Sequence, residues 1–391
     1  MTSTSASAII ASPRTSGASA ELRNAALISL QRCGTWPMTV PPCAPLPPCC
    51  VGVARVSRDC ERPSNVAPMS RPFRFSVQAF MPANAAEWYD TARAAEDLGY
   101  SCLHLADHYI GPGQAAAAAQ HPPQLVAAIP AMMAAAAVTT ELHIGARVMC
   151  VDYHHPVVLA KSLATIEMLS DGRLEAGFGA GWITSEYEAM GLTMDSPGTR
   201  IDRMLEYVEV AKAFFAGEQL DVHGRHVNVG GMTATPASPR PKGPPIMIGG
   251  GSPRVLRAAG AVADIVSLNF DNSAGMIGAR GLASGTAHAT AEKIEWVREG
   301  AGDRFAELEL ETAAYFVVVT DDSATASAGF ARAFGMSPDD VGNHVHMLIG
   351  SVDEICDTLE QRRRDYGISY VCVGSNNMRD FAPVVARLAG T

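Results

Sequence analysis

Short apolar runs alternate with longer segments of helical period from residue 71 to the end of the chain. Eight runs have the length and composition of buried strands, at 73–80, 101–106, 142–149, 173–178, 246–248, 264–269, 308–319 and 369–373. Helical spacing predicts helices at 85–98, 124–139, 156–169, 200–215, 253–261, 287–300, 322–334, 351–366 and at the C-terminal end. The polar insert 216–245 contains LDVHGRHVNV, which predicts a hairpin around Gly224.

Repeated strand–helix units predict a parallel sheet of the α/β class. Eight such units favour a closed (β/α)8 TIM barrel with insertions, in which function lies at the C-terminal ends of the strands. A doubly wound open sheet is the competing fold, but it would place one glycine fingerprint after the first strand. Here the glycine clusters follow the fourth and fifth strands. We therefore expect one barrel domain over 71–391.

Residues 1–70 differ from the rest of the chain. They are rich in Ser, Ala and Pro, with nine prolines and no lasting period. This composition predicts a disordered, dispensable extension, or a start codon placed too early, because Met69 stands just before the first strand. No cationic start precedes an apolar segment, so a secretory signal is not expected.

Charge and cysteine content narrow the class of protein. The net charge is −10, and residues 71–391 hold 24 Lys and Arg against 37 Asp and Glu. An acidic body argues against a nucleic-acid partner. The longest nearly apolar window, 125–138, is too short to span a membrane. Four of the nine cysteines stand in apolar runs of the barrel region, which predicts buried thiols in a reducing, cytoplasmic compartment.

The first candidate for chemistry is Asp107-His108, directly after the second strand. A histidine can move a proton near neutral pH, and a carboxylate can accept hydrogen bonds from a ligand. The alternative is a loop pair that only caps the next segment.

Two glycine-rich turns are the next candidates. In the turn 177–182, glycines let a flat ligand approach the backbone and Trp182 forms a wall, with Glu186 on the next turn. In the turn 249–252, free N–H groups at the start of a helix suit a phosphate, and Arg254 adds charge. The alternatives are a packed strand-to-helix turn and a flexible turn.

Weaker signals surround these motifs. Gly145 inside the third strand indicates a bulge or a close backbone contact. The histidine pairs at 154–155 and 344–346 lack a third ligand at a recognisable spacing, so a metal site is not expected. The alanine run 115–119 is interpreted as a flexible loop that acts as a lid.

A set of motifs in fixed order carries a family resemblance. RFSVQ, EDLGY, ADH, IGARV, HHPVVLAKSLATIEMLSDGRLEAGFGAGW and PIMIGGGSPRVLRAAG followed by ADIV resemble the bacterial luciferase-like monooxygenase superfamily, and within it the coenzyme F420-dependent oxidoreductases. The similarity runs from about Phe73 to the C-terminus, and residues 1–70 have no counterpart in it.

The resemblance implies a cofactor at the C-terminal ends of the strands, with Asp107 and His108 as catalytic residues beside a deazaflavin ring. It implies a non-proline cis peptide at Arg147-Val148 that backs the ring. The remaining implied contacts of the cofactor are Gly179, Ala180, Gly181, Trp182, Ser185, Gly249, Gly250, Gly251 and Ser252.

Two departures from the family pattern concern the substrate. Sugar-phosphate dehydrogenases of this group carry a catalytic Glu after the fourth strand, where Trp182 stands here. They also place a Trp shortly after the Asp-His pair, and here Pro112 stands nearby instead. Both departures argue against oxidation of a sugar phosphate.

Three functions follow from the resemblance. The first is hydride transfer between coenzyme F420 and a small organic substrate, with His108 as proton donor or acceptor. The alternative is a monooxygenase that uses reduced FMN, O2 and a partner flavin reductase. The third is a non-catalytic cofactor-binding protein, because no second acid is recognised beside His108. Relatives are often dimers, so a homodimer is expected by analogy.

Overall fold

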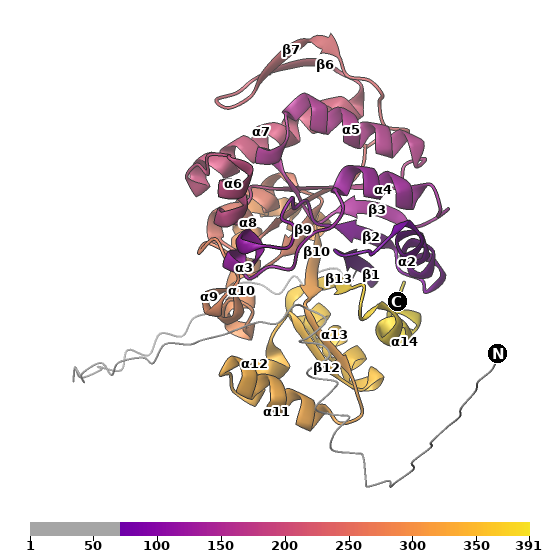
Figure 1. Cartoon of the computed structure of the whole chain (residues 1–391), viewed down its shortest axis with the longest axis vertical. Helices are drawn as coiled ribbons and strands as arrows, with labels where there is room; N and C mark the ends of the chain where they lie inside the picture. Colours follow the sequence, from indigo (N-terminus) through magenta and orange to yellow (C-terminus); the bar gives the residue numbers. More distant parts are fainter. Residues whose placement is uncertain (1–70) are drawn as a thin grey trace, which may run out of the picture. The chain divides into compact units, whose positions relative to one another are not determined.

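Eight parallel strands close into a barrel in the computed structural model, which describes residues 71–391 (Figure 1). The expectations for residues 1–70 lie outside the described residues. Pairing runs around the barrel and closes between the first and last strands. The strands are β1 (Arg74–Ala79), β2 (Cys102–Leu105), β3 (His143–Ala146), β5 (Leu174–Gly179), β8 (Ile246–Gly250), β9 (Ile265–Leu268), β10 (Glu309–Ala314) and β13 (Ile368–Gly374). The barrel predicted from the eight apolar runs is confirmed, and the open sheet is excluded.

The third strand is interrupted. After Ala146 the chain passes through a cis peptide between Arg147 and Val148, and resumes as β4 (Met149–Cys150), which pairs with β5. The cis peptide expected at this position is therefore present. Gly145 lies opposite a crowded interior, because a Cβ there would approach His104 Cδ2 to 2.8 Å. The close contact predicted at this glycine is confirmed.

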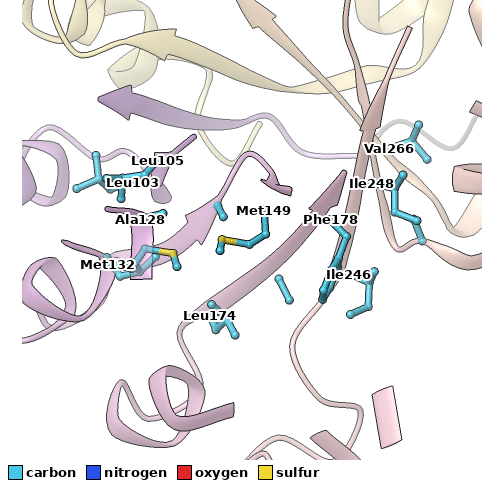
Figure 2. Close-up of a cluster of buried hydrophobic side chains, with 14 of the residues drawn as sticks. Leu103, Leu105, Ala128, Met132, Met149, Leu174, Phe178, Ile246, Ile248 and Val266 are labelled. Carbon is cyan, nitrogen blue, oxygen red and sulfur yellow. The ribbon is translucent and has the colours of Figure 1, made fainter. Parts of the chain in front are cut away.

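Burial on both faces explains why the strands are almost continuously apolar. Figure 2 shows part of the core between the sheet and its covering helices, where Leu103, Met132, Phe178 and Ile248 pack together with neighbouring side chains. All four side chains are fully buried. The four cysteines of the described chain, Cys102, Cys150, Cys356 and Cys372, are buried free thiols, as predicted.

Helices cover the outside of the barrel (Figure 1). Proline stands at the first turn of three of them, and a Ser351–Glu354 capping box opens another. The helices predicted from 156 and 253 begin at these residues, whereas the one predicted from 200 begins at Pro197. They are α2 (Ala85–Asp97), α4 (Ala128–Ala136), α5 (Pro156–Leu169), α7 (Pro197–Ala216), α8 (Pro253–Val262), α10 (Ala287–Ala301), α13 (Val352–Tyr366) and α14 (Met378–Leu388). None of the helices described here has the length and hydropathy of a membrane span.

Insertions and short elements complete the fold. The predicted hairpin is β6 (Gln219–His223) paired with β7 (Asn228–Thr233). The single strand predicted at 308–319 is wrong, because the chain leaves the barrel at Tyr315 and continues as β11 (Phe316–Val319), which pairs with β12 (Met347–Gly350). The other elements are α9 (Ala279–Ala283), α11 (Ser323–Phe334), α12 (Pro338–Asn343), η1 (Val151–Tyr153) and η2 (Gly302–Glu307).

The alanine run predicted as a loop is a helix, α3 (Gln114–Ala119). Ala116 and Ala119 are buried against Ile183, which lies just before α6 (Thr184–Met190). Alanine has the highest helix propensity and pays no side-chain entropy on burial. The small side chains therefore serve close helix packing, and the flexible-loop interpretation is corrected.

Candidate functional site

His108 lies just beyond the C-terminal end of β2 and is held by a carboxylate that comes from a distant segment. Its Nδ1 donates to Oε2 of Glu186 over 2.7 Å. The other oxygen of Glu186, Oε1, accepts the backbone N–H of Tyr109 over 2.5 Å. The Glu186 side chain is 1% exposed and the His108 side chain 12%. The second acid is therefore Glu186, in the first turn of α6, which the sequence analysis placed after the turn 177–182 but did not connect to His108.

Asp107, the residue before His108, pairs with a different histidine. Its Oδ2 accepts the backbone N–H of Cys150 over 3.1 Å and Nε2 of His154 over 2.7 Å. Asp107 is 2% exposed. These bonds tie the end of β2 to β4, so this carboxylate at least holds the scaffold, and its assignment as catalytic stays a prediction. One of the two histidines at 154–155 thereby has a partner inside the protein.

A second imidazole packs against His108. The ring of His121 lies 4.5 Å from that of His108, centroid to centroid, and 5.6 Å from that of Trp182. Burial, with a contribution from His108, holds the pKa of His121 well below its ordinary range. His121 follows α3 in a loop without a motif, so the sequence offered no signal for it.

Trp182 and Ser185 join this cluster to α3. Trp182 packs with Ile110, Ala116 and Ile183, and its ring lies 6.1 Å from that of His108. The hydroxyl of Ser185 donates to the carbonyl of Ala115 over 2.8 Å. Trp182 thus packs beside His108, and its role as a wall for a flat ligand stays a prediction, whereas the hydroxyl of Ser185 is used to attach α6 to α3.

Arg147 crosses the barrel interior from the third strand. Its Nε donates to Oε1 of Glu311 on β10 over 2.9 Å, and Nη1 donates to the hydroxyl of Tyr315 over 3.1 Å. Burial alone would lower the pKa of Arg147, but Glu311 and Tyr315 outweigh it and raise the pKa. The side-chain amide of Gln78 donates to the carbonyl of Arg147, at the cis peptide. Within the described chain, the buried Nη2 of Arg147 has no hydrogen-bond partner.

The glycines of the turn after β5 are required by the protein itself. A Cβ on Gly179 would lie 2.5 Å from Val148 Cγ2, and one on Gly181, at φ +71°, would overlap the Tyr187 hydroxyl. The carbonyl of Ala180 accepts Nε of Arg200 over 2.9 Å. The space beside Gly179 and Gly181 is therefore filled by neighbouring side chains. The close approach of a flat ligand to the backbone of this turn stays a prediction.

The turn 249–252 has the same internal constraint but leaves a helix start uncapped. A Cβ on Gly250 would overlap Val255, and one on Gly251 would overlap the carbonyl of Phe270. A Cβ on Gly249 would lie 3.4 Å from Val148 Cγ1, which is closer than most Cβ contacts but not an overlap. Ser252 is the N-cap of α8, and its side chain makes no capping hydrogen bond. A helix start of this kind suits an anion.

Arg254, which the sequence analysis placed beside this turn as an added charge, is paired elsewhere. Its Nη2 lies 2.6 Å from Oδ1 of Asp202 on α7. Its charge is therefore partly neutralised, and an anion at the start of α8 would rely mainly on the hydroxyl of Ser252 and the backbone.

Two further clusters of titratable groups are held together by contacts inside the fold. Glu175, at the start of β5, forms an ion pair with Arg74, lies 3.3 Å from Nε2 of His104 through Oε2, and accepts the hydroxyl of Tyr370 over 2.9 Å. His344 donates from Nε2 to the carbonyl of Leu282 over 2.9 Å. Among the described residues, Nδ1 of His104 in the first cluster and Nε2 of His346 beside the second are buried without a hydrogen-bond partner.

A cavity of about 230 Å³ is lined by Glu186 and by Tyr109, the residue that follows His108. Its other lining residues come from the loop between β2 and α3, from the start of α3, and from Ala189 and Met190 of α6.

Comparison with known proteins finds relatives among uncharacterised mycobacterial proteins and F420-dependent dehydrogenases. An uncharacterised protein of Mycobacterium tuberculosis is 32% identical over 170 residues, which cover 40% of this chain and 58% of that protein. F420-dependent glucose-6-phosphate dehydrogenase of Kineococcus radiotolerans is 28% identical over 199 residues, covering 50% of this chain and 55% of that enzyme. The chain thus spans little more than half the length of these curated relatives.

Solved structures share the fold at low identity. Coenzyme F420-dependent tetrahydromethanopterin reductase from Methanopyrus kandleri superposes with a TM-score of 0.63 at 18% identity, over 81% of this chain and 98% of that one. A long-chain alkane monooxygenase superposes with a TM-score of 0.64 at 16% identity, over 82% and 92% of the two chains. Residues 69–369 match the family model described as luciferase-like monooxygenase. The chain belongs to the luciferase-like monooxygenase family.

Proposed function

We propose that this protein transfers a hydride between coenzyme F420 and a small organic substrate, with His108 giving or taking the accompanying proton. The observation that carries the proposal is the His108–Glu186 hydrogen bond of 2.7 Å just beyond the end of β2. Barrel enzymes place their chemistry at this end of the strands. Relatives named as F420-dependent enzymes support the choice of cofactor.

The donor set at the end of the barrel fits such a cofactor. Ser252 has a hydroxyl free of capping bonds at an uncapped helix start, which suits the phosphate of a cofactor. Arg147 has a buried Nη2 without a partner among the described residues, and Val148 lies next to it at the cis peptide. We assign Gly249, Gly250 and Gly251 to the same phosphate contact through their backbone. When bound, a deazaflavin supplies or accepts a hydride.

His108 is the residue best placed to handle the proton. Glu186 occupies its Nδ1, and Nε2 has no hydrogen bond with any described residue. His121 is the competing imidazole, but its lowered pKa keeps it neutral beside His108. Asp107 is a weaker candidate because its Oδ2 already binds Cys150 and His154.

Trp182 and Pro112 depart from the pattern of the sugar-phosphate dehydrogenases, so we do not propose a sugar phosphate as the substrate. Trp182 places an indole beside His108, at 6.1 Å between ring centroids. An apolar wall of this kind favours a small organic substrate that presents little charge next to the imidazole.

Turnover of F420 with a panel of small carbonyl compounds, enones and imines tests the function. The absorbance of the oxidised cofactor reports hydride transfer directly. His108→Ala should lower kcat by about 10²–10⁴-fold, the usual contribution of a general acid or base. His108→Gln keeps a hydrogen bond but cannot titrate, and His155→Gln, at an exposed position, is the matched control.

Full turnover by both His108 variants would overturn the assignment of the proton to this residue. Turnover that requires reduced FMN and O2, with no response to F420, would overturn the proposed reaction and identify a flavin-dependent monooxygenase instead.

A further inference from the structure

Glu186 uses both of its carboxylate oxygens on the segment that carries His108. Oε2 accepts from Nδ1 of His108 and Oε1 accepts from the N–H of Tyr109. With the side chain 1% exposed, little solvent competes for either bond. The carboxylate therefore holds an imidazole and the backbone of the next residue at the same time.

An ionised carboxylate can only accept hydrogen bonds. Nδ1 of His108 must therefore carry a proton whenever the 2.7 Å bond is made. In the neutral imidazole, Nε2 is then bare, and in the imidazolium both nitrogens are protonated. A neutral His108 that faces Glu186 thus has one form, with a lone pair at Nε2.

We propose that Glu186 is a positioning residue that fixes His108 as the Nδ1–H tautomer, so that Nε2 is the nitrogen that exchanges a proton with substrate. This role rests on the proposed function for its chemistry, whereas the tautomer itself does not depend on the reaction. Glu186 acts through His108 and is not assigned a contact with substrate.

The adjacent His121 makes the assignment specific to one imidazole. Its Nδ1 also faces an acceptor, the carbonyl of Pro122 at 2.7 Å, so it adopts the same tautomer when neutral. A carbonyl carries no full charge, and burial lowers the pKa of His121. Of the two packed rings, only His108 has an anionic partner at Nδ1 within hydrogen-bond distance.

Glutamine at position 186 is the informative substitution because it keeps the size and removes the charge. Its amide has one acceptor oxygen and one NH2 group, so it cannot accept from both His108 and Tyr109. If the NH2 group faces His108, Nδ1 must become an acceptor and the proton moves to Nε2. If the oxygen faces His108, the NH2 group is forced against the Tyr109 N–H.

The experiment is ¹⁵N NMR of the imidazoles in the full chain, combined with steady-state kinetics. We expect wild-type neutral His108 to be protonated at Nδ1. Glu186→Gln should lose this single tautomer and lower kcat about 10–100-fold, with KM and the cofactor Kd within about threefold. Glu186→Asp should restore part of kcat, and Glu188→Gln, exposed on the same helix, should match the wild type.

The wild-type spectrum alone decides the tautomer, even where a variant fails to fold. A neutral His108 protonated at Nε2, or a mixture of tautomers, would overturn the proposal. So would a Glu186→Gln protein with the wild-type tautomer and wild-type kcat. A fixed Nδ1–H tautomer in a protein that shows no F420 turnover would overturn the proposed function alone.

Discussion

Buried His344 should make the fold sensitive to acid. In its neutral form both ring nitrogens are satisfied, since Nε2 donates to the carbonyl of Leu282 and Nδ1 accepts the N–H of His346 over 3.2 Å. Burial lowers the pKa of His344 to about 4, and the nearby charges of Arg362 and Lys293 act in the same direction. A proton on Nδ1 would point at the His346 N–H, so protonation breaks this arrangement.

The magnitude follows from the difference between the folded and unfolded pKa values. The unfolded chain binds a proton at the ordinary histidine pKa of about 6.5. Between pH 6.5 and 4 the unfolded state therefore holds more protons, and the free energy of unfolding falls as the pH is lowered. For this one side chain the loss is about 2 kcal/mol between pH 8 and pH 5, and about 3 kcal/mol at pH 4.

Urea denaturation at pH 8, 6.5 and 5 measures this loss. His344→Asn keeps an acceptor for the His346 N–H but cannot titrate. Between pH 8 and pH 5, the unfolding free energy of the variant should therefore fall by about 2 kcal/mol less than that of the wild type. Buried His346 is present in both proteins, and its pKa is lowered mainly by burial, with His344 as a smaller cause. His288→Asn, at an exposed position, should behave as the wild type. Parallel pH dependences for the wild type and His344→Asn would refute the argument.

Three other changes test separate parts of the structure. Ser252→Ala should weaken binding of intact cofactor about three- to tenfold in a calorimetric titration without lowering Tm, because the hydroxyl caps no N–H, and unchanged affinity would count against the phosphate site. Glu311→Gln should destabilise the fold by about 3–5 kcal/mol in chemical denaturation, since it leaves Arg147 as a buried unpaired charge, and adding Arg147→Met should recover part of the loss. Deletion of residues 1–70 should leave both unfolding free energy and cofactor affinity unchanged, and a large loss of either would show that this segment packs on the barrel.

Local pattern was sufficient for most of the barrel. The helix expected at 156–169 has these bounds in the structure, because a proline opens it and its apolar spacing persists to the end. The alanine run of α3 was misinterpreted, since alanine alone does not reveal whether a segment will be buried. The break at Tyr315 was also missed, because the apolar run continues from β10 into β11 while the sheet changes.

The partners of the candidate site depend on closure of the barrel. Glu186 is 78 positions from His108, and Glu311 is 164 positions from Arg147, so neither pairing has a local signal. The glycines of the two turns were recognised, but a sequence cannot tell what occupies the space beside them. At Gly179 that space is taken by Val148, across the interrupted third strand.

Mass spectrometry of the cofactor that co-purifies with the full chain, from a host that makes both coenzyme F420 and FMN, tests the central claim most directly. We expect the deazaflavin to be retained, released on denaturation in an amount comparable to that of the protein. Retention of FMN in its place would contradict the account and favour the reduced-flavin monooxygenase.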